Sequence, residues 1–175
     1  MNTNFSWSYD EFSRHYIARN ARILFSNIAG DAQDYNQEGR RNFRLEISED
    51  LARELQDQGI YVREREAKDN SEETQYLVKV SVYQDAEIRF LSGRSITPVL
   101  IDNNDKSRDG GRLIDNEFRK GHIINGEVKL EFHISKNTKV PSSSPYLRVD
   151  TMILPVRKSQ LLEEYEDRDN GEDAF

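Results

Sequence analysis

Polar and apolar residues alternate along several short stretches of this chain, a pattern typical of β-strands that bury one face. The clearest stretch is NFRLEI at residues 42–47, where Phe43, Leu45 and Ile47 share one side of the predicted strand. The pattern predicts further strands at residues 21–27, 60–66, 75–83, 87–101, 122–134 and 146–156. We therefore expect five or more strands, mostly antiparallel.

The first residues carry a helix-start signal. Ser8 and Glu11 form an S-x-x-E capping box, in which each side chain satisfies a backbone amide at the beginning of a helix. Trp7 and Phe12 stand at the positions of a hydrophobic staple. These signals predict a helix over residues 9–18.

A second helix is expected after the NFRLEI strand. Ser48 can cap it, Leu51 and Leu55 are four residues apart on one face, and Gly59 is a plausible stop. The sequence LIDNEF at residues 113–118 is expected to form one further helical turn.

The order of these elements shows no internal repeat and no alternation of strand and helix that would indicate a parallel sheet. We therefore expect a mainly β protein with a few helices, an OB-fold-like Greek-key barrel, with a β-sandwich as the alternative. The loop KNTKVPSSSP, residues 136–145, is expected to be a mobile hairpin tip. The predicted organisation is an N-terminal helical extension at 1–20, the barrel domain at 21–158 and a disordered acidic C-terminal tail at 159–175.

Composition agrees with a small, well-hydrated domain. The 175 residues are 35% hydrophobic and 33% charged, which favours one β-rich domain over an enzyme with a deep core. No run of about twenty apolar residues and no signal peptide is present, so we expect a cytosolic protein. The absence of cysteine excludes disulfides and thiolate metal sites.

The net charge is −7, but it is unevenly distributed. The last thirteen residues, EEYEDRDNGEDAF, hold seven acids and one arginine and so account for −6, which leaves −1 for residues 1–162. A nearly neutral body can still carry a basic stripe, so nucleic acid remains a candidate partner.

Enzyme and metal motifs are weak. Asp102, Asp105 and Asp109 lack the spacing and the final glutamate of a calcium loop, and no nucleophile elbow, P-loop, zinc-protease or dinucleotide motif occurs. His122 and His133 lie eleven residues apart without a carboxylate motif, and His15 falls on the predicted first helix, where its i+4 neighbour is Arg19. The sequence therefore predicts no catalytic residue, no metal site and no cofactor.

The segment DYNQEGRRNFRL combines arginines, amides and aromatic residues around Gly39. Single-stranded nucleic acid is held by cations along its phosphates and by aromatic rings stacked on its bases. The plainer interpretation is that Gly39 makes a turn, Phe43 enters the core and the arginines are only solvated. The predicted phosphate contacts are Arg40, Arg41, Arg44, Lys79, Arg89 and Arg94, and the predicted DNA-binding set also contains Asn36 and the stacking candidates Tyr35, Tyr83 and Phe90.

Several segments together form a recognisable pattern: ILFSNIAGDAQDYNQEGRRNFRLEI, EIRFLSGRSITPVL, INGEVKLEFHI, YLRVDTMILPV and the GEDAF ending, of which the N-x-E-G-R-R-N-F run at residues 36–43 is the most specific piece. In these segments the chain resembles a family of bacteriophage single-stranded DNA-binding proteins. The resemblance implies an OB-fold core, binding of single strands through several contacts, and a role in replication or recombination in the cytoplasm of the infected bacterium. The predicted N-terminal helix and the long 136–145 loop depart from the family pattern.

The C-terminus is similar to the acidic tails ending in phenylalanine of bacterial and phage single-strand-binding proteins. Its carboxylates can cover the basic groove in place of phosphates, and DNA would then displace them. Phe175, with Glu172 and Asp173 beside it, is predicted to enter a pocket on a replication or recombination partner. The sequence leaves open whether the chain forms a homo-oligomer.

Two alternatives remain. The first is a metal-dependent phage nuclease or nuclease accessory protein, with Asp85, Glu87 and Glu131 as candidate ligands. The second is a protein-only interaction module that uses the acidic tail as its active surface.

Overall fold

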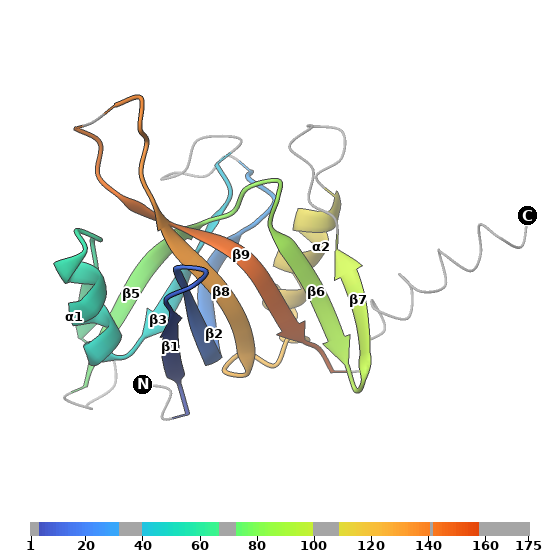
Figure 1. The fold of residues 1–175 in the computed structure, drawn as a ribbon. Helices are drawn as coiled ribbons and strands as arrows, with labels where there is room; N and C mark the ends of the chain where they lie inside the picture. The colour runs from blue at the N-terminus through green and yellow to red at the C-terminus, as the bar shows by residue number, and fades with distance from the viewer. Residues whose placement is uncertain (1–3, 32–39, 67–72, 100–108, 141, 158–175) are drawn as a thin grey trace, which may run out of the picture.

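The computed structural model describes residues 4–31, 40–66, 73–99, 109–140 and 142–157. Within these ranges the chain forms a nine-stranded sheet and two helices. Five strands make a ring in the order β5, β3, β2, β8, β9, and β9 pairs with β5 in parallel to close it. These strands are β2 (His15–Asn27), β3 (Asn42–Ile47), β5 (Thr74–Ser81), β8 (Val128–Ser135) and β9 (Tyr146–Pro155). The closed ring confirms the expected OB-like, mainly β barrel (Figure 1).

The other four strands extend the ring at its edges. Antiparallel pairing adds one strand to β2 and one to β5, while a two-stranded hairpin joins β9 through a parallel pairing. These additions are β1 (Ser6–Asp10) on β2, β4 (Arg63–Glu66) on β5, and the hairpin of β6 (Glu87–Ser92) and β7 (Ser95–Val99) on β9.

The interior is built by the alternation seen in the sequence. Phe43, Leu45 and Ile47 of β3 are all fully buried, as predicted for NFRLEI. Phe43 and Leu45 lie opposite Val80 and Val78 of β5, so the inward faces of the two strands meet in register. Arg44, between Phe43 and Leu45, points to the outer face and is half-buried, whereas Glu46 on the same face is buried.

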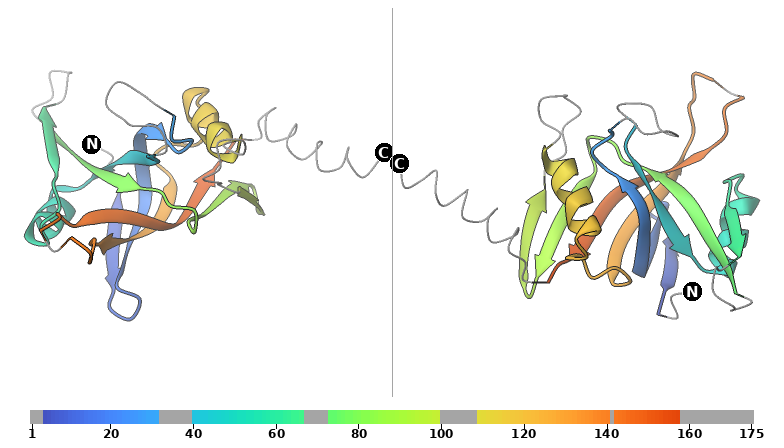
Figure 2. Two further views of the ribbon diagram at one scale, coloured as in Figure 1. Left: turned by 90° about the horizontal axis from the view of Figure 1, so that it is seen from above. Right: turned by 180° about the vertical axis from the view of Figure 1, so that it is seen from behind.

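The two helices lie on opposite sides of the barrel (Figures 1 and 2). The predicted second helix is confirmed as α1 (Glu49–Asp57): Ser48 occupies its N-cap position, Leu51 and Leu55 are buried, and Gly59 follows its end with φ of 87°. Neither helix in the described ranges is long and apolar enough to cross a lipid bilayer.

The helix α2 (Asp109–Arg119) is longer than the single turn predicted around residues 113–118. Its buried Asp115 carboxylate accepts backbone hydrogen bonds from Ile28 and Ala29, both at 2.9 Å, and one from the Ser26 hydroxyl at 2.7 Å. Asp115 thus satisfies the hydrogen-bonding needs of buried backbone amides just beyond β2. Because these bonds join residues far apart in sequence, local sequence patterns do not reveal them.

The predicted helix at residues 9–18 is wrong, because β1 and the start of β2 form an antiparallel hairpin there. Asp10, not a capping box, organises the turn: its carboxylate accepts the backbone N–H of Phe12 at 2.9 Å. Trp7 and Tyr9 pack on the buried ring of Tyr16, with centroids 6.1 and 4.8 Å away. Aromatic packing and sheet pairing therefore override the local helix signal. Strand β2 also runs through residue 20, where the boundary between the N-terminal extension and the barrel domain was predicted.

Two other predicted strands are divided or shortened. Residues 87–101 contain a turn at Gly93, which has φ of 60°, so the described part of this stretch is the β6–β7 hairpin. The predicted strand at 122–134 begins only at Val128, because residues 124–127 form a turn in which Gly126 donates its N–H to the carbonyl of Ala21.

Candidate nucleic-acid interface

A cavity of about 480 Å³ opens at the seam where β5 and β9 close the barrel. The seam is aligned by the register pairs Val80–Leu147 and Ser81–Arg148. A bond from the Val82 N–H to the Arg41 carbonyl extends the neighbouring β3–β5 pairing. The lining combines cations, hydroxyl and amide groups and two phenol rings: Arg40, Arg41, Asn42, Lys79, Ser81, Val82, Tyr83 and Tyr146.

Cations gather along the β3–β5 side of this cavity. Arg44 lies directly opposite Lys79 in the β3–β5 register, so the two side chains leave the same outer face. Within the described ranges, neither of them forms an ion pair with a carboxylate. These two residues define what we call the cation pair.

The pKa values of the cation pair are lowered by burial and by neighbouring positive charges. Partial burial lowers the pKa of Arg44, and the nearby charge of Arg63 lowers it further. Partial burial also lowers the pKa of Lys79, followed by the charges of Arg44 and Arg40. Within the described ranges, the positive charges of Arg44 and Lys79 thus stand close together without a carboxylate partner, a state that a bound anion would relieve.

The β9 side of the cavity carries aromatic rings. The rings of Tyr83 and Tyr146 are tilted by 37° with centroids 6.2 Å apart, and the Tyr83 hydroxyl donates to the Tyr146 hydroxyl at 3.3 Å. This bond is the main reason that the pKa of Tyr83 is raised, while a hydrogen bond with Ser135 is the first cause of the lowered pKa of Tyr146. We call Tyr83 and Tyr146 the tyrosine pair.

Arg148 connects the tyrosine pair to a second cavity. Its guanidinium carbon lies 4.1 Å from the centre of the Tyr83 ring, and its Nη2 donates to Asp85 at 2.6 Å. The bond to Arg148 holds the pKa of Asp85 below its ordinary value. Tyr83, Gln84, Asp85 and Arg148 line this second cavity of about 440 Å³, so Tyr83 borders both hollows.

The structure brings together part of the predicted DNA-binding set. Arg40, Arg41, Lys79 and Tyr83 all line the seam cavity, and Arg44 stands beside Lys79. Arg41, however, is only 5% exposed, so it belongs largely to the wall of the cavity.

Other predicted members lie elsewhere. The prediction of Phe90 as a stacking platform is wrong: inward orientation on β6 leaves it 2% exposed, in the hydrophobic core. Arg89 stands on the outward side of β6, 3.9 Å from Glu87, and Arg94 is exposed at the β6–β7 turn. Neither lines the seam cavity. The remaining predictions fall outside the described residues: Tyr35, Asn36, Glu172, Asp173 and Phe175.

Sequence reasoning missed the contribution of β9. Tyr146 and Arg148 are two residues apart in YLRV, and strand periodicity alone puts both on one face. This spacing could have indicated that the two side chains act together. What the sequence does not show is the parallel pairing that brings this face beside β5.

The acids named for a nuclease do not assemble. Asp85 is engaged by Arg148, Glu87 lies near Arg89, and Glu131 is held on β8 opposite Thr151. Among the residues that the structure describes, these three do not form a group close enough to share a metal ion.

Comparison with solved structures finds distant likenesses to a phage protein. The single-stranded DNA-binding protein from bacteriophage Enc34 matches as a C-terminal truncation with a TM-score of 0.45 and 9% identity, over 91% of this chain and 99% of that one. Another structure of the Enc34 protein matches with a TM-score of 0.44 and 8% identity, over 86% of this chain and 89% of that one. No curated protein matches the chain.

The family comparison is more informative, because it covers half of the sequence. The model described as "Putative phage ssDNA-binding domain" matches residues 11–98, a range that contains the cation pair and Tyr83. Domains of this kind bind DNA and are not catalysts. The chain belongs to this family of phage single-stranded DNA-binding proteins.

Proposed function

We propose that this protein coats single-stranded DNA without strong sequence preference during phage replication or recombination, in the cytoplasm of the infected bacterium. The observation that carries the proposal is the seam cavity, in which Arg40 and Lys79 face the same 480 Å³ space as Tyr83 and Tyr146. Cations beside stacking rings are the combination that holds an unpaired strand.

The phosphates of the strand would lie along the β3–β5 side. Arg44 and Lys79 supply adjacent positive charges there, and Arg40 also lines the cavity. Because burial and like charges lower the pKa of Lys79, a phosphate placed there stabilises the charged form of the ammonium.

The bases would stack on the β9 side. Tyr83 is 39% exposed, enough to offer part of its ring, and Tyr146 extends the aromatic surface. The guanidinium of Arg148 lies over one face of the Tyr83 ring and is tied to Asp85, so a base can stack on the outer face of the guanidinium or on the other face of the ring. Every base has a π face, and stacking of this kind therefore tolerates any sequence.

Fluorescence anisotropy of a labelled oligothymidine, measured with the full-length protein over a series of salt concentrations, tests this proposal. We expect saturable binding that weakens steeply with salt, and much weaker binding to a duplex of equal length. Equal affinity for single and double strands would contradict the proposal.

The acidic tail is proposed to regulate this binding. Residues 163–175 carry a charge of −6, opposite in sign to the cavity cations, and can therefore compete with phosphates for them. Deletion of these residues should tighten binding of oligothymidine several-fold at low salt, with less effect at high salt because screening weakens the competition. Unchanged affinity at low salt would defeat the competition model.

The end of the tail is proposed to recruit replication or recombination proteins. A terminal aromatic ring beside an α-carboxylate and the acids Glu172 and Asp173 fits an apolar pocket edged by basic residues. Phe175→Ala should abolish capture of such a partner by the immobilised protein while leaving oligothymidine binding intact. Capture by the variant at the level of the unaltered protein would rule out this role for Phe175.

A further inference from the structure

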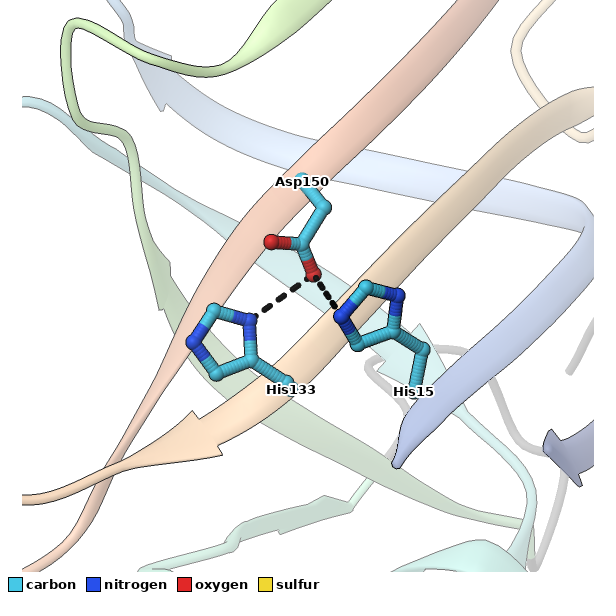
Figure 3. Close-up of side chains that lie close together, drawn as sticks. All are labelled: His15, His133 and Asp150. Carbon is cyan, nitrogen blue, oxygen red and sulfur yellow. Dashed lines mark hydrogen bonds and ion pairs between the residues drawn. The ribbon is translucent and has the colours of Figure 1, made fainter. Parts of the chain in front are cut away.

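Three side chains that are distant in sequence converge on the outer face of the barrel (Figure 3). His133 Nδ1 lies 2.8 Å from Oδ2 of Asp150, and His15 Nε2 lies 3.4 Å from the same oxygen. The two imidazole rings are stacked with centroids 5.5 Å apart. Each residue comes from a different strand, β2, β8 or β9, so the tertiary fold alone creates the cluster.

The register of the sheet explains why the histidines meet. Tyr16 pairs with Phe132 between β2 and β8, and one step further along this antiparallel ladder His15 reaches His133. The neighbours Tyr16 and Phe132 are buried and stack on each other, which fixes the strands beneath the histidines.

A β-bulge brings the carboxylate to them. Phe132 pairs with Val149 and Glu131 pairs with Thr151, so Asp150 is an extra residue on β9. Such an insertion re-aims a side chain, and bulges are common beside functional sites. Asp150 consequently points outward toward the imidazoles, while Val149 remains in the core.

Arg148, which lies beside the cluster, is paired with another carboxylate. Arg148 is the register partner of His133, but its guanidinium donates to Asp85 at 2.6 Å. The side chains of His15, His133 and Asp150 are 29%, 28% and 26% exposed, so ions from solvent can reach the cluster.

We propose that His15, His133 and Asp150 form a binding site for one divalent transition-metal ion of the zinc type. Two imidazole nitrogens and one carboxylate oxygen are a donor set that zinc accepts, with a further position left for water. The three ligating atoms all lie within 4.8 Å of one another. Bonds of about 2.0–2.1 Å in tetrahedral geometry place ligand atoms about 3.3 Å apart, close to the Asp150 distances already present.

This inference revises the sequence-based expectation of no metal site, which placed His15 on a helix that does not form. It goes beyond DNA binding and does not depend on it. A bound ion would join the β1–β2 hairpin to β8 and β9 and add positive charge near Arg148.

Cobalt absorption spectroscopy on the tag-free, full-length protein, freed of metal by chelation, tests the site. Co²⁺ titration should give one saturable set of visible bands of the intensity expected for four or five ligands, and one equivalent of Zn²⁺ should displace them. His133→Gln and His15→Gln should each weaken binding by about tenfold or more, since loss of even an outer-shell partner costs that much.

His122→Gln is the matched control, because His122 bonds to Glu117 and lies outside the cluster. It should leave the Co²⁺ bands and the affinity unchanged. The tail carboxylates are the same in all these proteins, so any weak binding to them cancels in the comparison.

NMR of the histidine side chains gives a second readout that needs no variant. One equivalent of Zn²⁺ should shift the ring signals of His15 and His133 and leave those of His122 in place. Absence of saturable binding, unchanged affinity in both folded glutamine variants, or ring shifts confined to His122 would overturn the proposal. If a variant fails to fold, the NMR result on the unaltered protein still decides.

Discussion

The β3–β5 surface and the β9 surface beside the seam cavity hold their cations in opposite ways. On the β3–β5 side, Arg44 and Lys79 lie opposite each other, and no ion pair within the described ranges neutralises them. On the β9 side, Arg148 is tied to Asp85 and rests on the Tyr83 ring. The cation pair is therefore suited to attract phosphate from a distance, whereas Arg148 and the tyrosine pair form a preset surface for bases.

This difference has a measurable meaning. Binding through free cations depends on the release of counterions and so falls with salt, whereas stacking depends little on salt. Substitutions on the two sides should consequently separate into those that change the salt slope and those that change affinity at a constant slope.

The largest effect is expected from removal of the cation pair. Arg44→Ala combined with Lys79→Ala should weaken oligothymidine binding about 100-fold at low salt, at roughly 1.5 kcal/mol for each charge-assisted contact. The slope of log affinity against log salt should fall by about 1.4, since a single strand loses about 0.7 for each phosphate contact. Anisotropy titrations at four or more salt concentrations measure both quantities.

A matched double variant controls for net charge. Arg119→Ala with Lys120→Ala removes two cations at the C-terminal end of α2, outside the seam cavity. An equal loss of affinity in this control would mean that overall charge, rather than the β3–β5 surface, attracts the DNA.

An intermediate effect is expected from loss of the Tyr83 ring. Tyr83→Ala should weaken binding by about 1–3 kcal/mol, the usual value for one stacked base, at an unchanged salt slope. Tyr83→Phe keeps the ring and should stay within about twofold of the unaltered protein, because the stacking surface survives the loss of the hydroxyl. If Phe and Ala at this position weaken binding equally, the hydroxyl bond to Tyr146, and not stacking, explains the role of Tyr83.

The smallest effect is expected from freeing Arg148. Asp85→Asn removes the charge that holds its guanidinium, so binding should tighten a few-fold and the salt slope should steepen by about 0.7. Weaker binding by this variant would show that Asp85 has to hold Arg148 in place over the ring.

The ion pair between Arg148 and Asp85 also predicts how DNA binding by the unaltered protein depends on pH. Arg148 lowers the pKa of Asp85, so this carboxylate stays ionised throughout pH 5–8 and the pair persists. Any tightening that arises from protonation of Asp85 should therefore begin only below the ordinary carboxyl range near pH 4. Anisotropy measured from pH 8 downward, in parallel with Asp85→Asn, tests this sign.

The sequence predicted the parts of the molecule that local pattern controls. The buried face of NFRLEI and the helix that ends before Gly59 were predicted because hydrophobic periodicity and a glycine stop act within a few residues, although the Ser48 side chain at the N-cap makes no capping hydrogen bond. The same local logic failed at the N-terminus, where Trp7 and Tyr9 gain more by packing on Tyr16 in a hairpin than a capping box provides.

The candidate site was only partly predictable for a related reason. Period-two alternation shows that neighbouring residues face opposite ways, but it does not show which way, and Phe90 was assigned to the wrong face. Tyr146, Arg148 and the histidine cluster depend on strand register and on the bulge at Asp150, which arise from pairing between distant segments.

The closure of the barrel gives the site a mechanical consequence. β5 and β9 pair through only two register pairs, the shortest ladder in the ring. The seam cavity is lined by Lys79 from β5 and by Tyr146 from β9. A DNA strand that contacts both β5 and β9 would hold the two strands together. Bound DNA would therefore raise the free energy of local opening of the barrel at this seam. Amide hydrogens near Ser81 and Leu147 would then exchange with solvent more slowly when DNA is bound. Hydrogen exchange at the shortest strand pairing of the barrel would thus report DNA binding.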